Sequence, residues 1–172
     1  MPEYQSSFIE ILESIPDPPD SQEHYDIAED VAQAIYERLD DLPAINMWEA
    51  PLRNFFALYE LNCQVGNGGF AQASYNVPEL FPLAEQAFIE LGCNNAAKLC
   101  RQAIEILPQE IREHSEKLID QATDIGLVFE HFEVSEMANL DAMIPDEFWV
   151  EERLSNYVLK NRQHFLSLDN PS

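Results

Sequence analysis

Glycine, cysteine and basic residues are all scarce in this chain of 172 residues. Its three cysteines, Cys63, Cys93 and Cys100, contain no C-x-x-C pair, and their odd number fits a reducing cytosol better than a disulfide framework. The N-terminal segment 1–13 lacks the basic and apolar regions of a secretory signal. No apolar run approaches the roughly 18 residues of a membrane span. We therefore expect a soluble cytoplasmic protein.

Basic residues number 9 against 32 acidic residues, which gives a net charge of −23. This charge repels phosphates and anionic lipids, so it excludes direct nucleic-acid binding and disfavours membrane binding. It favours a strongly basic partner attracted over a long range. Disorder often explains so acidic a composition, but the apolar residues here are too abundant and too periodic for a disordered chain.

The acidic residues are concentrated in two blocks. The net charge is −12 over residues 1–50 and −9 over residues 101–150, but only −2 over residues 51–100 and 0 over residues 151–172. An acidic surface adapted to high salt is an alternative explanation. That alternative predicts acidity throughout the chain and poor folding at low salt, where the charges repel one another unscreened.

Apolar residues recur with helical spacing along nearly the whole chain, as Ile27, Val31 and Ile35 do. We find no convincing alternating strand and no repeat. The prediction is an all-α fold, a compact single-domain array of roughly nine or ten helices over residues 1–172 without significant sheet. Residues 1–20 are expected to form an N-terminal helix and a Pro/Asp-rich connector packed on the main body. The expected helices are 6–15, 21–41, 51–65, 69–75, 81–91, 94–107, 108–124, 134–143 and 146–165.

The glycine-rich sequence GNGGF at residues 66–70 fits the pattern G-x-G-x-x-A when Ala71 is included. A dinucleotide-binding loop requires a preceding strand and a βαβ unit, whereas the residues before Gly66 have helical spacing. The Lys-Ser/Thr of a phosphate-binding loop is also missing. We interpret the segment as a helix stop at Gly66, a left-handed turn and a helix restart at Gly69.

Motifs for metal binding or catalysis are missing. No histidine has a glutamate three residues before it, and there is no H-E-x-x-H or calcium loop. Glu110, Glu113 and His114 could contact a metal, but a second ligand pair is lacking. There is no G-x-S-x-G, although a spatial triad is not excluded by sequence. We expect no cofactor, no metal and no enzymatic activity.

Acidic residues form a stripe along each of two predicted helices. On a helical wheel the acids of the first helix fall within about 60° and those of the second within about 80°. A solvated face is the common explanation, but such a face normally mixes Glu and Lys at i,i+4 spacing. The first stripe comprises Glu23, Asp26, Asp30, Glu37 and Asp41, and the second comprises Glu110, Glu113, Asp120 and Asp124.

The amount of charge matches that of DNA. A compact domain of this length has a radius of gyration of about 16 Å and spans roughly 40 Å. Duplex DNA of ~40 Å carries about 23 phosphate charges. The net charge of −23 therefore equals that of a DNA segment as long as the protein. Acids arranged in lines at this density indicate a surface that imitates phosphate backbones.

One segment resembles a known family. Glu60-Leu61-Asn62, followed by Asn67, Gly68, Gly69, Phe70, Gln72 and Asn76, is similar to the marker segment of a bacterial all-helical domain family with an N-G-G-F core. The helical pattern extends the likeness from about residue 25 to 165. The family includes a DNA-mimic protein. The resemblance implies a helical domain that occupies the DNA-binding surface of a helix-turn-helix repressor.

Our leading hypothesis is therefore a non-enzymatic DNA mimic that regulates transcription. The acids of the two stripes would stand in for phosphates opposite Lys and Arg. Self-repulsion favours a monomer or a weak homodimer. The alternative is an enzyme or a small-ligand-binding protein with a polar pocket near residues 59–76. Its polar groups would come from Tyr59, Asn62, Gln72, Tyr75 and Asn76.

Overall fold

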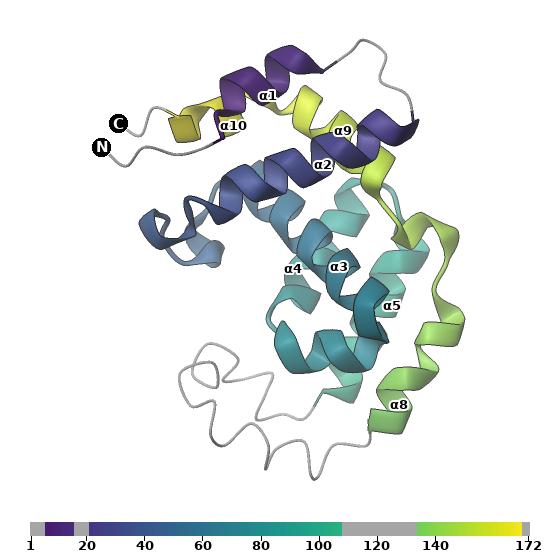
Figure 1. Cartoon of the computed structure of the whole chain (residues 1–172). Helices are drawn as coiled ribbons and strands as arrows, with labels where there is room; N and C mark the ends of the chain where they lie inside the picture. Colours follow the sequence, from purple (N-terminus) through teal and green to yellow (C-terminus); the bar gives the residue numbers. More distant parts are fainter. Residues whose placement is uncertain (1–5, 16–20, 108–133, 170–172) are drawn as a thin grey trace. The chain divides into compact units, whose positions relative to one another are not determined.

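The structure is a computed structural model, which describes residues 6–15, 21–107 and 134–169 (Figure 1). Within these ranges every regular element is helical, with eight α-helices, five 3-10 helices and no strand. The all-α prediction is confirmed. The helix expected at 108–124 lies outside the described residues.

The α-helices are α1 (Phe8–Ser14), α2 (Ser21–Tyr36), α3 (Ala50–Asn76), α4 (Leu80–Glu90), α5 (Asn94–Ile106), α8 (Val134–Asn139), α9 (Glu151–Lys160) and α10 (Arg162–Leu166). The 3-10 helices are η1 (Leu39–Asp41), η2 (Ile45–Met47), η3 (Asp141–Met143), η4 (Asp146–Phe148) and η5 (Ser167–Asp169).

Contacts divide the chain into two compact units. The terminal unit comprises Met1–Tyr59 and Val150–Ser172, and the central unit comprises Glu60–Trp149. Helix α3 passes from the terminal unit into the central unit between Tyr59 and Glu60. A single domain over residues 1–172 stays a prediction.

The terminal unit is built on the predicted apolar stripe of α2. Ile27, Val31 and Ile35 are buried, and α2 packs against α9 and α1 (Figure 1). Phe8 and Phe165 add an aromatic contact between α1 and α10, with ring centroids 6.2 Å apart. The stripe ends earlier than expected because α2 stops at Tyr36 and η1 follows as a separate turn.

Within the terminal unit, Arg38, which follows α2, forms a buried ion pair with Asp169 near the C-terminal end of the described residues. The Arg38 side chain is 3% exposed and donates to Asp169 Oδ1 at 2.8 Å, while the Asp169 side chain is 10% exposed. Arg38 also donates to the carbonyls of Ala34 at 2.6 Å and Ser6 at 2.8 Å. Asp169 Oδ2 accepts from Ile9 N at 3.0 Å in the first turn of α1. Several hydrogen bonds thus compensate the burial of both charges.

The central unit encloses a cluster of phenylalanines, and α4 packs against α5 beside it (Figure 1). Phe70 lies 5.9 Å from Phe81 and 5.5 Å from Phe148, measured between ring centroids. Phe88 lies 5.3 Å from Phe148. All four rings are buried. The family-marker phenylalanine, Phe70, is therefore a core residue.

The glycine-rich segment is a kink within α3, and it breaks the helix later than predicted. The expected stop at Gly66 is wrong, because the non-helical residues are Gly68 and Gly69. Gly69 has φ 73° and ψ −175°, a region that is essentially restricted to glycine. A Cβ on Gly69 would lie 2.3 Å from Asp141 Oδ2, and Asp141 Oδ1 accepts from Phe70 N at 2.8 Å. The kink lets a carboxylate approach the backbone where the helix resumes.

Two other boundary predictions have different outcomes. The stop at Gly92 is confirmed, since α4 ends at Glu90 and Gly92 has φ 76°. The continuous helix expected over 146–165 is wrong, because η4, α9 and α10 replace it. Phe148 and Val150 are both buried, yet they would point about 200° apart on a helix. Extended geometry at Trp149 allows both to be buried.

Candidate partner-binding surface

Helix α2 presents an acidic outer face. Its 16 residues include four acids and no lysine or arginine. Since Ile27, Val31 and Ile35 point inward, the side chains of Asp26, Glu29 and Asp30 are exposed on the outer arc of the helix. The structure thus places two of the predicted stripe acids, Asp26 and Asp30, on an exposed face, and adds Glu29.

The helix dipole explains only some of these acids. Glu23 lies half-buried in the first turn of α2, where a negative charge is stabilising. The effect falls off beyond that turn, so Glu29 and Asp30 gain little from it. Among the described residues, neither Glu29 nor Asp30 forms an ion pair or a side-chain hydrogen bond. The fold itself therefore gives no account of these two charges.

Glu37 is engaged inside the fold. It lies after the end of α2 and is half-buried. Its Oε2 accepts from Ser6 N at 2.9 Å and its Oε1 from Ser6 Oγ at 3.3 Å. Asp41 is the last residue of η1, and its side chain is not among those that the structure describes. The predicted stripe therefore does not continue as one helical row beyond Tyr36.

The second predicted stripe lies outside the described residues. Its members all fall within residues 108–133. His114, which could contact a metal together with two of these acids, lies in the same range. These members are Glu110, Glu113, Asp120 and Asp124.

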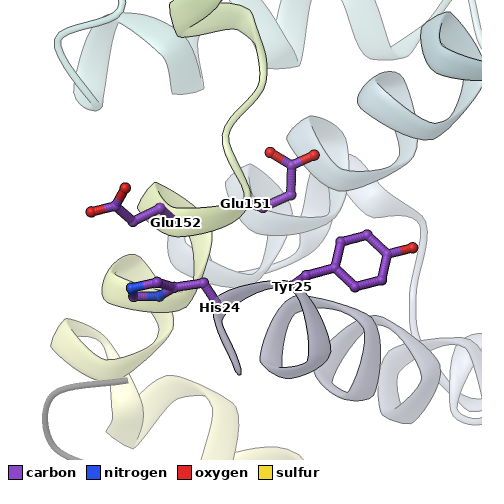
Figure 2. Close-up of a pocket in the computed structure, with 4 residues that line it drawn as sticks. All are labelled: His24, Tyr25, Glu151 and Glu152. Carbon is purple, nitrogen blue, oxygen red and sulfur yellow. The ribbon is translucent and has the colours of Figure 1, made fainter. Parts of the chain in front are cut away.

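A hollow opens where α2 packs against the start of α9. It has a volume of about 470 Å³ and is lined by His24, Tyr25, Glu151 and Glu152 (Figure 2). Figure 2 shows Glu152 on the side of His24 and Glu151 on the side of Tyr25. The Tyr25 side chain is 51% exposed, which is high for a large ring. We call this feature the α2–α9 hollow.

The sequence interpretation missed Glu29 and both glutamates of the α2–α9 hollow. Glu29 lies outside the arc that holds the other acids of its helix. Glu151 and Glu152 belong to a C-terminal segment with no net charge, because three basic residues offset its acids. The available signal was local: two adjacent acids in the first turn of α9.

A histidine–serine pair ties α2 to α9 beside the hollow. His24 Nδ1 is hydrogen-bonded to Ser155 Oγ. Ser155 Oγ also lies within hydrogen-bond distance, 3.0 Å, of the backbone carbonyl oxygen of Glu152. Ser155 is fully buried. A buried hydroxyl whose proton is already engaged suits a structural tie and not an accessible nucleophile.

The polar segment near residues 59–76 forms a network within the central unit. Gln64 Oε1 accepts from Gln72 Nε2 at 3.2 Å and from Asn76 Nδ2 at 2.7 Å. Gln64 Nε2 donates to Glu60 Oε1 at 2.7 Å. These amides thus bind one another.

The other polar groups expected near residues 59–76 lie in different surroundings. In the terminal unit, the Tyr59 ring stacks on Phe55 with centroids 6.0 Å apart. In the central unit, Asn62 is half-buried and Tyr75 is exposed. A small-ligand pocket in this segment stays a prediction.

One carboxyl group beside this network is unusual. Burial raises the pKa of Glu79 above its ordinary value of 4.5, a backbone hydrogen bond within Glu79 opposes the rise, and the nearby charge of Glu60 adds to it. Glu79 Oε2 is buried without a hydrogen-bond partner among the described residues. Its charged form is therefore disfavoured in the folded chain.

Metal-binding clusters and membrane-spanning helices are both absent from the described part of the chain. No group of three or more His, Cys, Asp or Glu side chains in residues 6–15, 21–107 and 134–169 is arranged to hold a metal ion. In the same ranges, no helix combines the length and the apolar character that crossing a membrane requires.

Comparison with known proteins assigns the family. No curated protein and no solved structure matches the chain. A family model described as DMP19-like protein matches residues 46–161, which is shorter at its N-terminal end than the likeness expected from residue 25. The match includes the GNGGF segment and the start of α9 but begins after α2. Because it covers 116 of 172 residues, the chain belongs to the DMP19-like protein family.

Proposed function

We propose that this protein is a DNA mimic. It binds the DNA-contacting surface of a basic DNA-binding protein, a helix-turn-helix transcriptional repressor, and prevents DNA binding by competition. It thereby regulates transcription in the cytoplasm, without a cofactor or catalysis. The observation that carries the proposal is the outer face of α2, where Asp26, Glu29 and Asp30 are exposed and no basic residue is present.

Charge density supports a surface formed by more than one helix. With 16 residues, α2 is about 24 Å long, so its four acids provide one charge per ~6 Å. Duplex DNA provides one per ≈ 1.7 Å. Helix α2 alone is too sparse to imitate a duplex. Glu151 and Glu152, which line the hollow together with two residues of α2, raise the local charge density.

Two separate lines of evidence support the role of a DNA mimic. Family membership supports it through residues 46–161, since the resemblance noted above is to a family that includes a DNA-mimic protein. The acidic face of α2 lies outside the matched residues and is argued from its own geometry. The face therefore needs an experiment of its own.

A gel-shift competition tests the proposal. Proteins captured from native cytosol by the pure protein, and eluted with graded salt, are identified and bound to their own DNA. Excess mimic is expected to release that DNA at low salt and to lose this effect as salt screens the charges. If no captured protein ever loses its DNA at low salt, the proposal is wrong.

A matched pair of variants assigns the effect to α2. Glu29→Lys with Asp30→Lys is expected to abolish competition without unfolding the chain, because both side chains are exposed. Glu10→Lys with Glu13→Lys on α1 changes the net charge equally at two exposed positions and is expected to retain most competition. Equal loss in both variants would mean that only total charge matters.

A small-ligand or enzymatic function near residues 59–76 is the second candidate. The observation that favours it is Glu79, whose raised pKa and buried oxygen resemble those of functional carboxylates. A screen for small molecules that raise the melting temperature of the wild type tests this candidate. Gln64→Leu, which removes the amide network, should lose the effect of a true ligand.

A further inference from the structure

The α2–α9 hollow differs from the rest of the acidic surface because it has an aromatic wall. The Tyr25 ring is half exposed at one side, and the carboxylates of Glu151 and Glu152 come from a different helix (Figure 2). Its volume of about 470 Å³ is within the range of ≈ 300–1,000 Å³ typical of ligand pockets. The hollow is therefore large enough to receive the end of a long side chain.

We propose that the α2–α9 hollow binds one arginine side chain of the basic partner, with the guanidinium group stacked on Tyr25 and paired with Glu151, the glutamate on the same side of the hollow (Figure 2). This inference rests on the proposed function, and it adds an aromatic contact that phosphate imitation alone does not provide.

Arginine fits this lining better than lysine for two reasons. A planar guanidinium stacks on an aromatic face and also forms paired hydrogen bonds with a carboxylate. A lysine ammonium is a compact, strongly hydrated point charge that gains less from both. The Tyr25 side of the hollow offers one aromatic ring and the carboxylate of Glu151, which are the groups that distinguish the two side chains.

The carboxylates of Glu151 and Glu152 give both sides of the hollow a negative lining. Anions are disfavoured in the hollow, since both glutamates would repel them.

The hollow is continuous with the acidic face of α2. Tyr25 and Glu29 are four residues apart on α2, and residues at this spacing are neighbours on a helix surface. A partner helix that carries several basic residues could therefore pair with Glu29 and Asp30 while one of its arginines enters the hollow. Duplex DNA presents rows of phosphates to the same helix but no tyrosine ring.

Two labelled peptides provide the test without knowledge of the partner. Peptides of nine arginines and nine lysines have the same length and charge, so a difference in affinity reports side-chain type. Binding is measured by fluorescence anisotropy at low salt with the full-length protein. Wild type is expected to bind the arginine peptide more tightly by about fivefold or more, as one desolvated cation–π contact provides.

Variants of Tyr25 assign that preference. Tyr25→Leu is expected to remove most of the fivefold preference and leave the affinity for the lysine peptide unchanged, whereas Tyr25→Phe retains the ring and the preference. Tyr75→Leu is the matched control, because Tyr75 is 50% exposed but lies in the central unit. Circular dichroism checks that each variant is folded. Glu151→Gln should weaken arginine binding more than lysine binding.

The outcomes separate the two proposals. If Tyr25→Leu binds both peptides as the wild type does, or weakens both equally, the arginine site is wrong even when gel-shift competition succeeds. If the wild type binds neither peptide at low salt and releases no DNA, the DNA-mimic proposal fails with it. The two proposals are both supported if Tyr25→Leu loses the preference for arginine and if Glu29→Gln with Asp30→Asn weakens the binding of the two peptides equally.

Discussion

Three acidic residues of the central unit and two on the outer face of α2 are used differently. In the central unit, Glu147 Oε1 accepts from Asn95 N at 2.6 Å and Ala96 N at 3.2 Å, which caps the start of α5. Asp141 accepts from the backbone at the kink of α3, and Glu85 pairs with Arg101. On α2, Glu29 and Asp30 have no such partner among the described residues.

This difference identifies charges that the fold does not require. Acids at a helix start or beside a buried base stabilise the chain. Like charges four residues apart, such as Asp26 and Asp30, destabilise a helix by roughly 0.2–0.5 kcal/mol per pair. Glu29 and Asp30 are adjacent exposed acids without such a contact among the described residues, and this is where we expect a function in binding.

The largest loss of stability is expected for Asp169 of the terminal unit. An acid that makes contacts inside the fold stabilises it, whichever unit the acid belongs to. Asp169→Ala leaves the buried guanidinium of Arg38 without its ion-pair partner. We expect a loss of about 3–5 kcal/mol in the free energy of unfolding, measured by urea denaturation. Asp40→Ala, at an exposed position, is the control and should change stability little. Equal effects would contradict the comparison.

The second prediction concerns the acid at the kink, Asp141. Gly69→Ala places a Cβ against its carboxylate and forces alanine into a glycine-only conformation. We expect a loss of about 1–3 kcal/mol in thermal or urea unfolding.

Gly66→Ala is the control for that change. Gly66 is helical, and its added Cβ would meet Trp149 at an ordinary distance of 3.8 Å. It should therefore gain roughly 0.5–1 kcal/mol. If both substitutions stabilise the chain, the kink is not a strained position.

The third prediction concerns Glu79 of the central unit, whose charged form is disfavoured in the folded chain. The pKa of Glu79 is higher in the folded chain than in the unfolded chain. The stability that Glu79 contributes is therefore fully present below its unfolded-state pKa, and it is lost as the pH rises through its folded-state pKa. Glu79→Gln should therefore melt higher than wild type at pH 7 and similarly at pH 4. The gain should be smaller than the loss in Gly69→Ala. Glu105→Gln, at an exposed position, should show no such pH-dependent difference.

Helical periodicity predicted most of the fold. It identified the buried stripe of α2 and the bounds of α4 and α5 to within about a residue, because these helices bury one face and end at local signals such as Gly92. It placed the kink of α3 too early, because Asp141 lies 71 residues from Phe70 and no local signal shows which glycine it approaches.

The candidate site was predictable only in part. Spacing on α2 placed Asp26 and Asp30 correctly on the outer face. It could not show that Glu37 binds Ser6, 31 residues away. The α2–α9 hollow requires two helices distant in sequence to pack together, and its glutamates were concealed by basic residues in the same segment.

The smallest effect on stability is expected for Glu29 and Asp30, the two acids that we propose bind the partner. Glu29→Gln with Asp30→Asn removes two charges that have no internal partner, so urea denaturation should show no loss and a gain of a few tenths of a kcal/mol as repulsion along α2 falls. The same protein should compete poorly with DNA for a basic DNA-binding protein at low salt. Stability and binding would then change in opposite directions, which is expected of charges retained for a partner. A loss of more than about 1 kcal/mol would instead mean that these acids support the fold.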